Sequence, residues 1–515
     1  MAVYDFESIA RFQNREDELA ALGRWFDKAD ERRALGIFGR RRVGKSWLFR
    51  AFAHGREADI FVATTRDLAD QLATFASVLE RDGERPDLPD IEAFFRLLYR
   101  RAREDRRLAI IDELPNLLRV DRALPSTLLK VMEEEAASSK LKLIVTGSHV
   151  GMMERLFAER EPLHDRVQPL RVRPLDFWEA RLLLGDGPAD RLLTAFGIAG
   201  GMPRYLVELA GAPDPVARLA ELSLDPLGPL FDEPRAILGQ ELEAPAVHFS
   251  LLAALAVGPA GYGDIQKRSR VDYDKIGRYL TTLEALGLVT PRFPVTDPGR
   301  VSHSRLYTLS DGFLRFWFRY VFPFQPDLEA GLDRRIVVES EILPTLASHL
   351  APTIEDIARQ WVRRTRIANA TRVGAWWGPS LNELRRTNER SSEEIDIVGM
   401  RGKQVVLVGE VRWRSEPMDL GILGELERFK LPALAQVPGV KVGRPVVVLV
   451  SRSGFTPGLV EAARRQERII LVDPETMTSA QVTSGPALPR LPPGSASGPD
   501  RRPDGPPGAH TPQRG

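Results

Sequence analysis

The 515-residue chain is longer than one ordinary hydrophobic core supports, so about three or four domains are expected. Its 72 Lys and Arg side chains balance 71 Asp and Glu, so the overall charge does not point to nucleic acid. The absence of cysteine excludes disulfide scaffolds, thiolate metal sites and cysteine nucleophiles. Without an apolar run of ~20 residues or a signal-peptide core, the sequence predicts a cytoplasmic protein with no membrane partner.

The first predicted element is an amphipathic helix near the N-terminus. Residues 12–16 are FQNRE, and apolar side chains follow at helical spacing, at Leu19, Leu22, Trp25 and Phe26. By itself this pattern indicates an ordinary helix that packs one face against a core. A phosphate-binding motif follows this segment in the chain.

That motif is the stretch 39–46, GRRRVGKS, which matches the phosphate-binding pattern G-x-x-x-x-G-K-[ST] in full. The apolar run 34–38 before it predicts a buried strand, and residues 47–54 predict a helix. Such a loop wraps phosphate oxygens in backbone N–H groups, its lysine neutralises the β- and γ-phosphates, and its serine can ligate Mg²⁺. This context disfavours a glycine turn that merely contains a lysine. The predicted nucleotide contacts are Gly39, Arg40, Arg41, Arg42, Val43, Gly44, Lys45 and Ser46.

A pair of acidic residues marks a further strand. Residues 107–118, RLAIIDELPNLL, predict an apolar strand that ends at Asp112 and Glu113, at the sheet edge where ligands bind in open α/β folds. There Asp112 would hold Mg²⁺ through water, and Glu113 would orient or deprotonate the attacking water. A solvated acidic turn is the alternative for such a pair alone. The phosphate loop upstream favours the catalytic interpretation.

Two further segments complete the predicted core. Residues 141–146 predict a strand that ends in Thr146 and leads to Ser148. Residues 162–174 present Arg166 ahead of a short strand at 170–172, and a helix follows from Asp176. Arg166 can stabilise transition-state charge in its own subunit or from a neighbouring one, or it can be an ordinary surface arginine.

These motifs in combination resemble the archaeal-ATPase-type family of AAA+/STAND P-loop proteins, over roughly residues 10–240. The features that carry the resemblance are FQNRE, GRRRVGKS, LAIIDEL, VTGS, HDR…RPLDFWEA and GGMPRYL. It implies ATP and Mg²⁺ as cofactors, and it places the segment 12–16 beside the adenine. It also implies that Ser148 or Thr146 touches the γ-phosphate or the water, although a serine here can instead cap the next helix. Arg166 and Arg204 become candidates for nucleotide sensing.

Residues 247–318 predict a different unit. Helical periodicity at 249–256, 262–267 and 272–286, followed by a hairpin around 295–305, is the element order of a winged helix. The residues that can meet DNA are Lys275, Arg278 and Tyr279 on the recognition helix and Arg300, His303 and Arg305 on the wing. Because no dense basic stripe is visible, a packing or regulatory module is the alternative.

The C-terminal third contains a second possible chemistry. Asp396 lies in the strand-like run 394–400, and Glu410 and Arg412 lie in the next one, 405–413. This arrangement resembles the metal site of PD-(D/E)XK nucleases over roughly residues 335–475, and Glu355 would supply the family's additional acid. The motif has lysine where this chain has Arg412, and arginine does not exchange a proton near neutral pH. A hairpin with alternating charges on its solvent face is the alternative.

The expected fold is therefore α/β, with several units. These are an AAA+-like P-loop core at 1–175, a helical lid at 176–243, a winged helix at 244–325, a restriction-endonuclease-like domain at 330–480 and a disordered Pro/Gly-rich tail at 484–515. Three functions compete: an ATP-hydrolysing switch, an ATP-regulated Mg²⁺-dependent DNA nuclease, and an ATP-sensing DNA-binding regulator. The expected partners are ATP, and DNA, another protein or a second copy of the chain.

Overall fold

The computed structural model describes residues 14–28, 33–242, 245–297, 305–381 and 392–479. Residues 12 and 13, the wing residues Arg300 and His303, and the predicted tail at 484–515 lie outside these ranges. Within them, no helix is long and apolar enough to cross a membrane.

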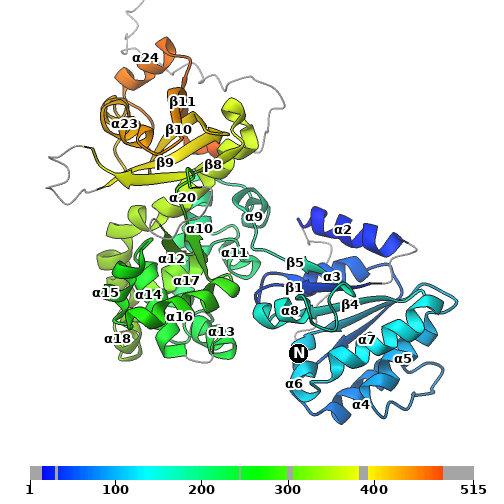
Figure 1. The fold of residues 1–515 in the computed structure, drawn as a ribbon. Helices are drawn as coiled ribbons and strands as arrows, with labels where there is room; N and C mark the ends of the chain where they lie inside the picture. The colour runs from blue at the N-terminus through cyan, green and yellow to red at the C-terminus, as the bar shows by residue number, and fades with distance from the viewer. Residues whose placement is uncertain (1–13, 29–32, 243–244, 298–304, 382–391, 480–515) are drawn as a thin grey trace, which may run out of the picture.

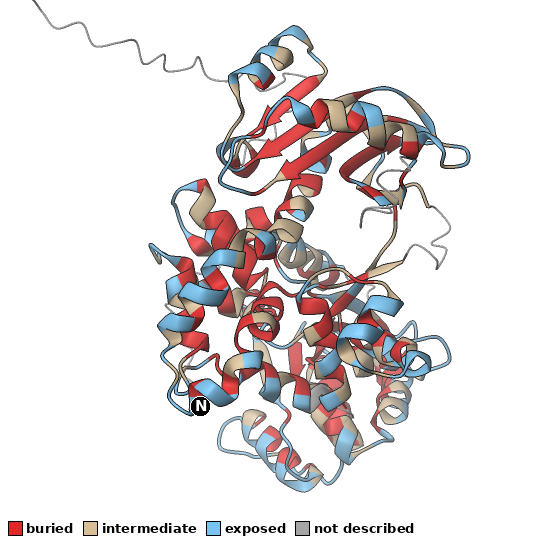
Figure 2. Cartoon of the chain, turned by 90° about the vertical axis from the view of Figure 1, so that its left-hand side faces the viewer, coloured by how far each residue is buried: buried red, intermediate tan, exposed pale blue. Residues whose placement is uncertain are grey.

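The N-terminal part is built on a five-stranded parallel sheet in the order β2-β3-β4-β1-β5 (Figure 1). Every residue of β1, β3 and β4 is buried, which is why these strands appear in the sequence as largely apolar runs. Across the described residues, buried side chains lie in the interior and exposed ones mainly on the outer helices and loops (Figure 2). The strands are β1 Ala34–Phe38, β2 Ala58–Val62, β3 Leu108–Asp112, β4 Lys142–Gly147 and β5 Val167–Arg171.

Helices cover both faces of this sheet, because alternate residues of a strand point to opposite sides. In β1, Leu35 and Ile37 pack in one apolar cluster with α2 and α3, whereas Ala34 and Phe38 pack in another with α4, α5 and α7. The helices of this part are α2 Glu16–Asp27, α3 Lys45–Ala53, α4 Leu68–Val78, α5 Ile91–Arg101, α6 Leu114–Val120, α7 Leu124–Glu135 and α8 Val150–Leu156.

Two predicted boundaries differ from the structure. Helix α3 begins at Lys45, directly after Gly44, so the last residues of the phosphate-binding motif already form its first turn. Strand β5 begins at Val167, three residues earlier than the strand predicted at 170–172. It lies at the edge of the sheet, where Pro169 removes no ladder hydrogen bond and only Val167 of its five residues is buried.

A helical region with one small strand pair follows the sheet. Its middle is α17, whose Phe313, Phe316 and Trp317 have no exposed surface. The strands β6 and β7 pair antiparallel. The elements are α9 Phe177–Leu184, α10 Ala189–Ala199, α11 Pro203–Leu209, α12 Pro215–Ser223, α13 Glu233–Glu241, α14 Pro245–Ala256, α15 Tyr262–Ser269, α16 Tyr273–Ala285, β6 Val289–Arg292, β7 Leu306–Leu309, α17 Gly312–Tyr320, α18 Gln325–Glu329 and α19 Arg334–Val337.

The C-terminal part is a mixed five-stranded sheet in the order β12-β11-β10-β9-β8. Strands β8, β9 and β10 pair antiparallel, whereas β10, β11 and β12 are parallel. The long helix α20 joins this sheet to the helical region (Figure 1). The elements are α20 Leu343–Thr365, β8 Arg372–Pro379, β9 Ser392–Arg401, β10 Gln404–Arg412, α22 Gly421–Glu425, α23 Leu431–Ala435, β11 Lys441–Ser451, α24 Pro457–Arg465, β12 Ile469–Val472 and α25 Pro474–Thr478.

Candidate functional site

The phosphate-binding motif forms a tight loop between β1 and α3. Gly44 has φ 98° and Gly39 leaves no room for a side chain, because a Cβ there would lie 2.4 Å from the carbonyl oxygen of Val172. Both positions therefore require glycine. The Lys45 ammonium is buried and donates hydrogen bonds to the carbonyl oxygens of Gly39 (2.9 Å) and Arg40 (3.1 Å), which pre-positions its charge inside the loop.

Strand order brings the acidic pair to the same edge. Because β4 lies between β1 and β3, the carboxyl ends of all three strands meet beside the loop. Asp112 is buried there and accepts a hydrogen bond from the Thr146 hydroxyl of β4. Burial raises the pKa of Asp112, and the Thr146 hydrogen bond and the nearby Lys45 charge oppose this shift. A buried carboxylate beside a phosphate loop fits a divalent cation that would offset its charge.

Glu113 lies where β3 turns into α6, with φ 57° and ψ 47°. This left-handed conformation is uncommon for a residue with a side chain and is typical of functional sites. Its carboxylate accepts hydrogen bonds from the Ser148 hydroxyl (2.9 Å) and the Ser148 backbone N–H (3.3 Å). Ser148 does not cap α8, whose N-cap residue is His149. The structure thus places Ser148 on Glu113, where it orients that carboxylate.

The N-terminal segment packs against the loop. The Arg15 guanidinium donates to the carbonyl oxygens of Val43 (3.2 Å) and Arg173 (2.6 Å), so it ties the loop to the connection after β5. The neighbouring Asn14 is buried, and its amide nitrogen has no hydrogen-bond partner within the described ranges. A buried amide that lacks a partner fits a nucleotide base with its acceptor atoms. The predicted place of the segment 12–16 is consistent with this geometry, although its first two residues are not described.

The loop arginines contact the helical region. Arg40 pairs with Asp311 at the start of α17 (2.8 Å), with side chains 11% and 1% exposed. Arg42 pairs with Glu233 at the start of α13 (2.9 Å), with side chains 39% and 3% exposed. Burial raises the pKa of Glu233, and the Arg42 charge opposes this shift. Sequence reasoning assigned these arginines only to phosphate and missed both partners, because no local pattern links positions so far apart.

A close backbone contact lies beside these ion pairs. Gly200 and Gly312 approach so closely that a Cβ on Gly312 would lie 2.6 Å from the Gly200 nitrogen. Helix α11 begins directly after, and a Cβ on Gly44 would lie 3.9 Å from Pro203. The predicted sensor Arg204 pairs with Glu208 of its own helix. The GGMPR segment is therefore packed between the phosphate loop and α17.

Arg166 is not at the nucleotide edge of its own subunit. It immediately precedes β5, and its carbonyl oxygen accepts a hydrogen bond from the backbone of Ala34 at the start of β1. The phosphate loop follows the opposite end of β1, so the length of a five-residue strand, about 16 Å, separates the two. The Arg166 side chain is half exposed and pairs with Glu133 (3.0 Å). The structure contradicts a role for Arg166 at the phosphates of its own loop.

The predicted DNA-facing residues of α16 form no basic stripe. Lys275 pairs with Asp272 (2.6 Å), and the Arg278 guanidinium lies 5.7 Å from the centre of the Tyr279 ring. Arg305 packs over Phe293 and Tyr307. These contacts are ordinary surface and packing interactions.

A second cluster of charged side chains lies on the C-terminal sheet. Asp396 of β9 accepts a hydrogen bond from the backbone N–H of Val411 (2.8 Å). Glu410 of β10 has no exposed surface and pairs with both Arg412 (2.9 Å) and Lys430 (2.6 Å). Lys430 was not identified from the sequence, because it lies 20 residues after Glu410 and outside the strand motif. Lys430 is the last residue of the π-helical turn Leu426–Lys430.

The acidic residues of this cluster influence one another. Burial raises the pKa of Glu355 to about 8, with Asp396 adding repulsion and Arg359 opposing it. Burial raises the pKa of Glu410 to about 7, again with repulsion from Asp396. Asp396 thus lies near enough to act electrostatically on both Glu355 and Glu410. In the part of the chain that the structure describes, however, no three such groups converge closely enough to hold a metal ion alone.

Comparison with known proteins supports the nucleotide site. Residues 12–209 match a family described as an ATPase domain predominantly from Archaea, and residues 317–421 match a family of archaeal and bacterial proteins of unknown function. The chain therefore contains an archaeal-type P-loop ATPase domain, which confirms that part of the sequence-based resemblance. An uncharacterized protein of Methanocaldococcus jannaschii is 26% identical over 413 residues, which are 78% of this chain and 88% of that protein.

Several solved structures are distantly similar to this chain. A Walker-type ATPase of Pyrococcus abyssi has a TM-score of 0.44 and 20% identity, covering 60% of this chain and 96% of that one. Cdc6p from Pyrobaculum aerophilum has a TM-score of 0.30 and 14% identity, covering 62% and 95%. The ORC1 protein of Aeropyrum pernix, solved in complex with DNA, has a TM-score of 0.30 and 16% identity, covering 65% and 94%. At these values the likenesses carry no functional argument.

Proposed function

We propose that this protein is an ATP-hydrolysing switch whose phosphate loop controls the position of the helical region and, through α20, of the C-terminal sheet. The observation that carries the proposal is the pairing of Arg40 and Arg42, both within the phosphate loop, with Asp311 and Glu233 outside the ATPase sheet. A ligand that rearranges the loop must therefore act on α13 and α17.

The residues at the loop support hydrolysis as well as binding. Lys45 and the loop N–H groups would hold the phosphates, and Ser46 and Asp112 would hold Mg²⁺, which would offset phosphate charge. Glu113, held by Ser148, orients the attacking water and accepts its proton. An occupancy sensor without hydrolysis would not need this second carboxylate.

The two ion pairs differ in the free energy that each contributes to holding the loop against the helical region. Arg40 and Asp311 are both largely buried, and breaking a buried pair typically costs about 3–5 kcal/mol because one charge is left uncompensated. Arg42 is more than one third exposed, so solvent screens its pair and weakens it. We therefore assign the main coupling to Arg40 and Asp311. When phosphate competes for Arg40, Asp311 and the start of α17 must adjust.

Substitution of Arg40 tests this coupling. Parent protein with a non-hydrolysable ATP analogue should show altered hydrogen–deuterium exchange at the start of α17, and Arg40→Ala should lose at least half of that change. Asp311→Asn is the better partner variant than alanine, because Asp311 also caps α17 by accepting from Leu314 N–H (2.9 Å) and asparagine keeps that cap.

Arg41 provides a matched control in the same loop. The phosphate contact predicted for Arg41 is through its backbone N–H, which alanine keeps. Its side chain is exposed and makes no ion pair within the described ranges, so Arg41→Ala should bind the analogue and preserve the exchange response. An Arg40→Ala protein that binds the analogue and responds like the parent would contradict the switch. Loss of analogue binding by Arg40→Ala alone would instead assign Arg40 to the phosphates.

A second candidate function is Mg²⁺-dependent cleavage of nucleic acid by the C-terminal part. Its support is Lys430, which brings an ammonium to Glu410 and so offers the lysine that the strand motif lacks. The order of helix α20, three antiparallel strands, a helical segment and a parallel strand also suits a nuclease-like core. In this interpretation Glu355, Asp396 and Glu410 hold the metal together with phosphate oxygens of the substrate, since no three described side chains converge closely enough to hold it alone, and Arg412 contacts phosphate.

Variants of Lys430 separate its role from that of Arg412. If the site cleaves DNA, Glu410→Ala and Lys430→Ala should each reduce Mg²⁺-dependent cleavage at least a hundredfold, because metal binding and charge stabilisation are both lost. Arg412→Lys should retain most of the cleavage. The measurement is loss of a labelled duplex on a gel, with melting temperatures to verify folding. Equal cleavage by parent and Glu410→Ala would reject this function.

A further inference from the structure

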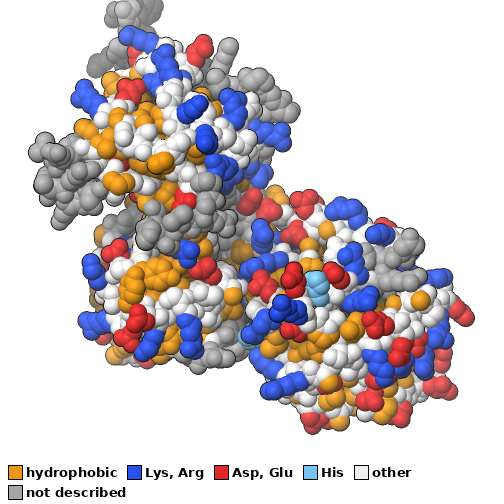
Figure 3. All heavy atoms as spheres, in the orientation of Figure 1, with side chains coloured by type: hydrophobic (Ala, Val, Ile, Leu, Met, Phe, Trp, Pro, Cys, Tyr) orange, Lys and Arg blue, Asp and Glu red, His pale blue; other side chains and the backbone are white. Residues whose placement is uncertain are grey.

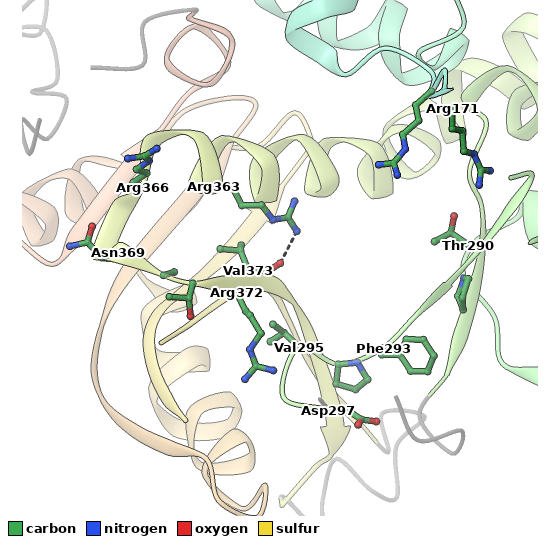
Figure 4. A pocket seen from close by; sticks show the side chains of 15 residues that line it. Arg171, Thr290, Phe293, Val295, Asp297, Arg363, Arg366, Asn369, Arg372 and Val373 are labelled. Carbon is green, nitrogen blue, oxygen red and sulfur yellow. Dashed lines mark hydrogen bonds between the residues drawn. The ribbon is translucent and has the colours of Figure 1, made fainter. Parts of the chain in front are cut away.

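A broad cleft lies where the ATPase core, the helical region and the C-terminal sheet meet. Its volume is about 1490 Å³, and its lining comes from the end of β5 and the connection after it, from β6 and the residues that follow, and from the end of α20 and the start of β8. Figure 4 shows Arg363 and Arg372 on one side of this space and Thr290 and Phe293 on the other. Five arginines line it, namely Arg171, Arg173, Arg363, Arg366 and Arg372.

These arginines are exposed and poorly neutralised. Asp297 is the one acidic residue in the described lining. Arg171 pairs with Glu154 (2.8 Å), but Arg363 and Arg372 donate to the carbonyl oxygens of Val373 (2.6 Å) and Gly402 (3.1 Å). For the other two guanidiniums, the described part of the chain supplies no ion pair. Figure 3 shows Lys and Arg side chains along the flank of the C-terminal part that faces the ATPase core.

From this arrangement we infer that the cleft binds nucleic acid through its phosphate backbone. Guanidinium groups match the geometry of phosphate oxygens, and positive charges gathered on two segments far apart in the sequence suit an extended chain of phosphates better than one small anion. The half-buried Phe293 adds an aromatic surface inside the cleft. Binding is independent of sequence, because the lining offers charge and few groups that distinguish bases.

The cleft leads toward the C-terminal carboxylates. Arg363 lies one helical turn after Arg359, which donates to the backbone carbonyl of Asp396 (2.6 Å). On the facing segment, Arg292 precedes Phe293 and approaches Asp356 of α20 (3.6 Å). Helix α20 thus links the cleft lining, through the buried Arg359, to Asp396. The inference goes beyond the proposed switch and requires neither ATP hydrolysis nor cleavage.

Fluorescence anisotropy tests the inference directly. The full chain is titrated against a labelled 25-base-pair duplex and against one of its single strands, in EDTA and without nucleotide. The parent should bind at least one of them, with a slope of log affinity against log salt of roughly −4.5 for duplex if all five arginines contact phosphate. Arg173→Ala/Arg366→Ala should weaken binding at least about tenfold and reduce the slope by about 2.

Further variants locate the surface. Arg363→Ala/Arg372→Ala should show the same loss, whereas Arg464→Ala/Arg465→Ala, with the same change of charge on α24 outside the lining, should bind like the parent. Unchanged melting temperature and ATP affinity verify that the cleft variants are folded. Lys45→Ala should lose ATP and keep nucleic-acid binding, which separates this inference from the switch.

Three outcomes would overturn the inference. The first is no binding of either probe by the parent, which would favour an acidic protein partner for the cleft. The second is an equal loss in the α24 control, because total charge and not the cleft would then govern affinity. The third is full binding by both cleft variants together with a loss in Lys275→Ala/Arg278→Ala, because helix α16 would then be the contact surface.

Discussion

Lys45→Ala is expected to abolish measurable ATP binding. The Lys45 ammonium is buried and held by the carbonyl oxygens of Gly39 and Arg40, so it already occupies the interior of the loop where phosphate oxygens would lie. A hydrogen bond to a charged group contributes about 1.5–3 kcal/mol, and two phosphate contacts together account for a loss of at least two orders of magnitude. Isothermal titration with ATP and Mg²⁺ measures this loss.

Lys275→Ala is the matched control for this prediction. Lys275 is exposed and pairs with Asp272, so its removal changes the charge by the same amount without touching the loop. Melting temperatures of both variants verify that they are folded. Parent-like ATP affinity in Lys45→Ala would remove the phosphate-loop assignment and the switch with it.

Glu113→Gln is expected to bind ATP normally and to reduce turnover by about 10²- to 10⁴-fold, the usual contribution of a general base. Glutamine is nearly isosteric, and it can keep a hydrogen bond with Ser148 while it cannot accept the proton of the attacking water. Steady-state phosphate release measures turnover, and titration with ATP measures binding.

Two comparisons make the Glu113 prediction specific. Glu159→Gln changes an exposed carboxylate on the same part of the chain and should leave turnover unchanged. Ser148→Ala should cause a smaller loss than Glu113→Gln, because it removes only the group that orients the carboxylate. If Glu113→Gln hydrolyses ATP at the parental rate, another residue activates the water.

Much of the ATPase part was predictable because its signals are local. A buried parallel strand produces a continuous apolar run, and for β1 the prediction at 34–38 coincides with the observed bounds. Gly39 and Gly44 are needed by the backbone itself, so the loop could be recognised without a structure. For β5 the prediction was less accurate, because an edge strand with Pro169 and exposed polar residues has no apolar run to detect.

The partners of the charged residues were not predictable, because they depend on which segments the fold brings together. Arg166 lies in the HDR segment that suggested a nucleotide-sensing role. The register of β5 on β1 nevertheless places it at the end of the strands opposite the phosphate loop. Lys430 reaches Glu410 of β10, because a helical segment 20 residues later in the chain packs against the sheet. Neither relation leaves any periodicity in the sequence.

The sequence by itself determined the nucleotide chemistry of this protein, since a phosphate loop and its acidic pair are short motifs whose backbone requirements dictate residue type. Only the tertiary structure decided what that chemistry is connected to. Arg40 and Arg42 reach Asp311 and Glu233, and five arginines from two distant segments share one cleft, because packing of distant elements sets those distances. Long-range electrostatic partnership is a property of the folded chain and is encoded in no local stretch of it.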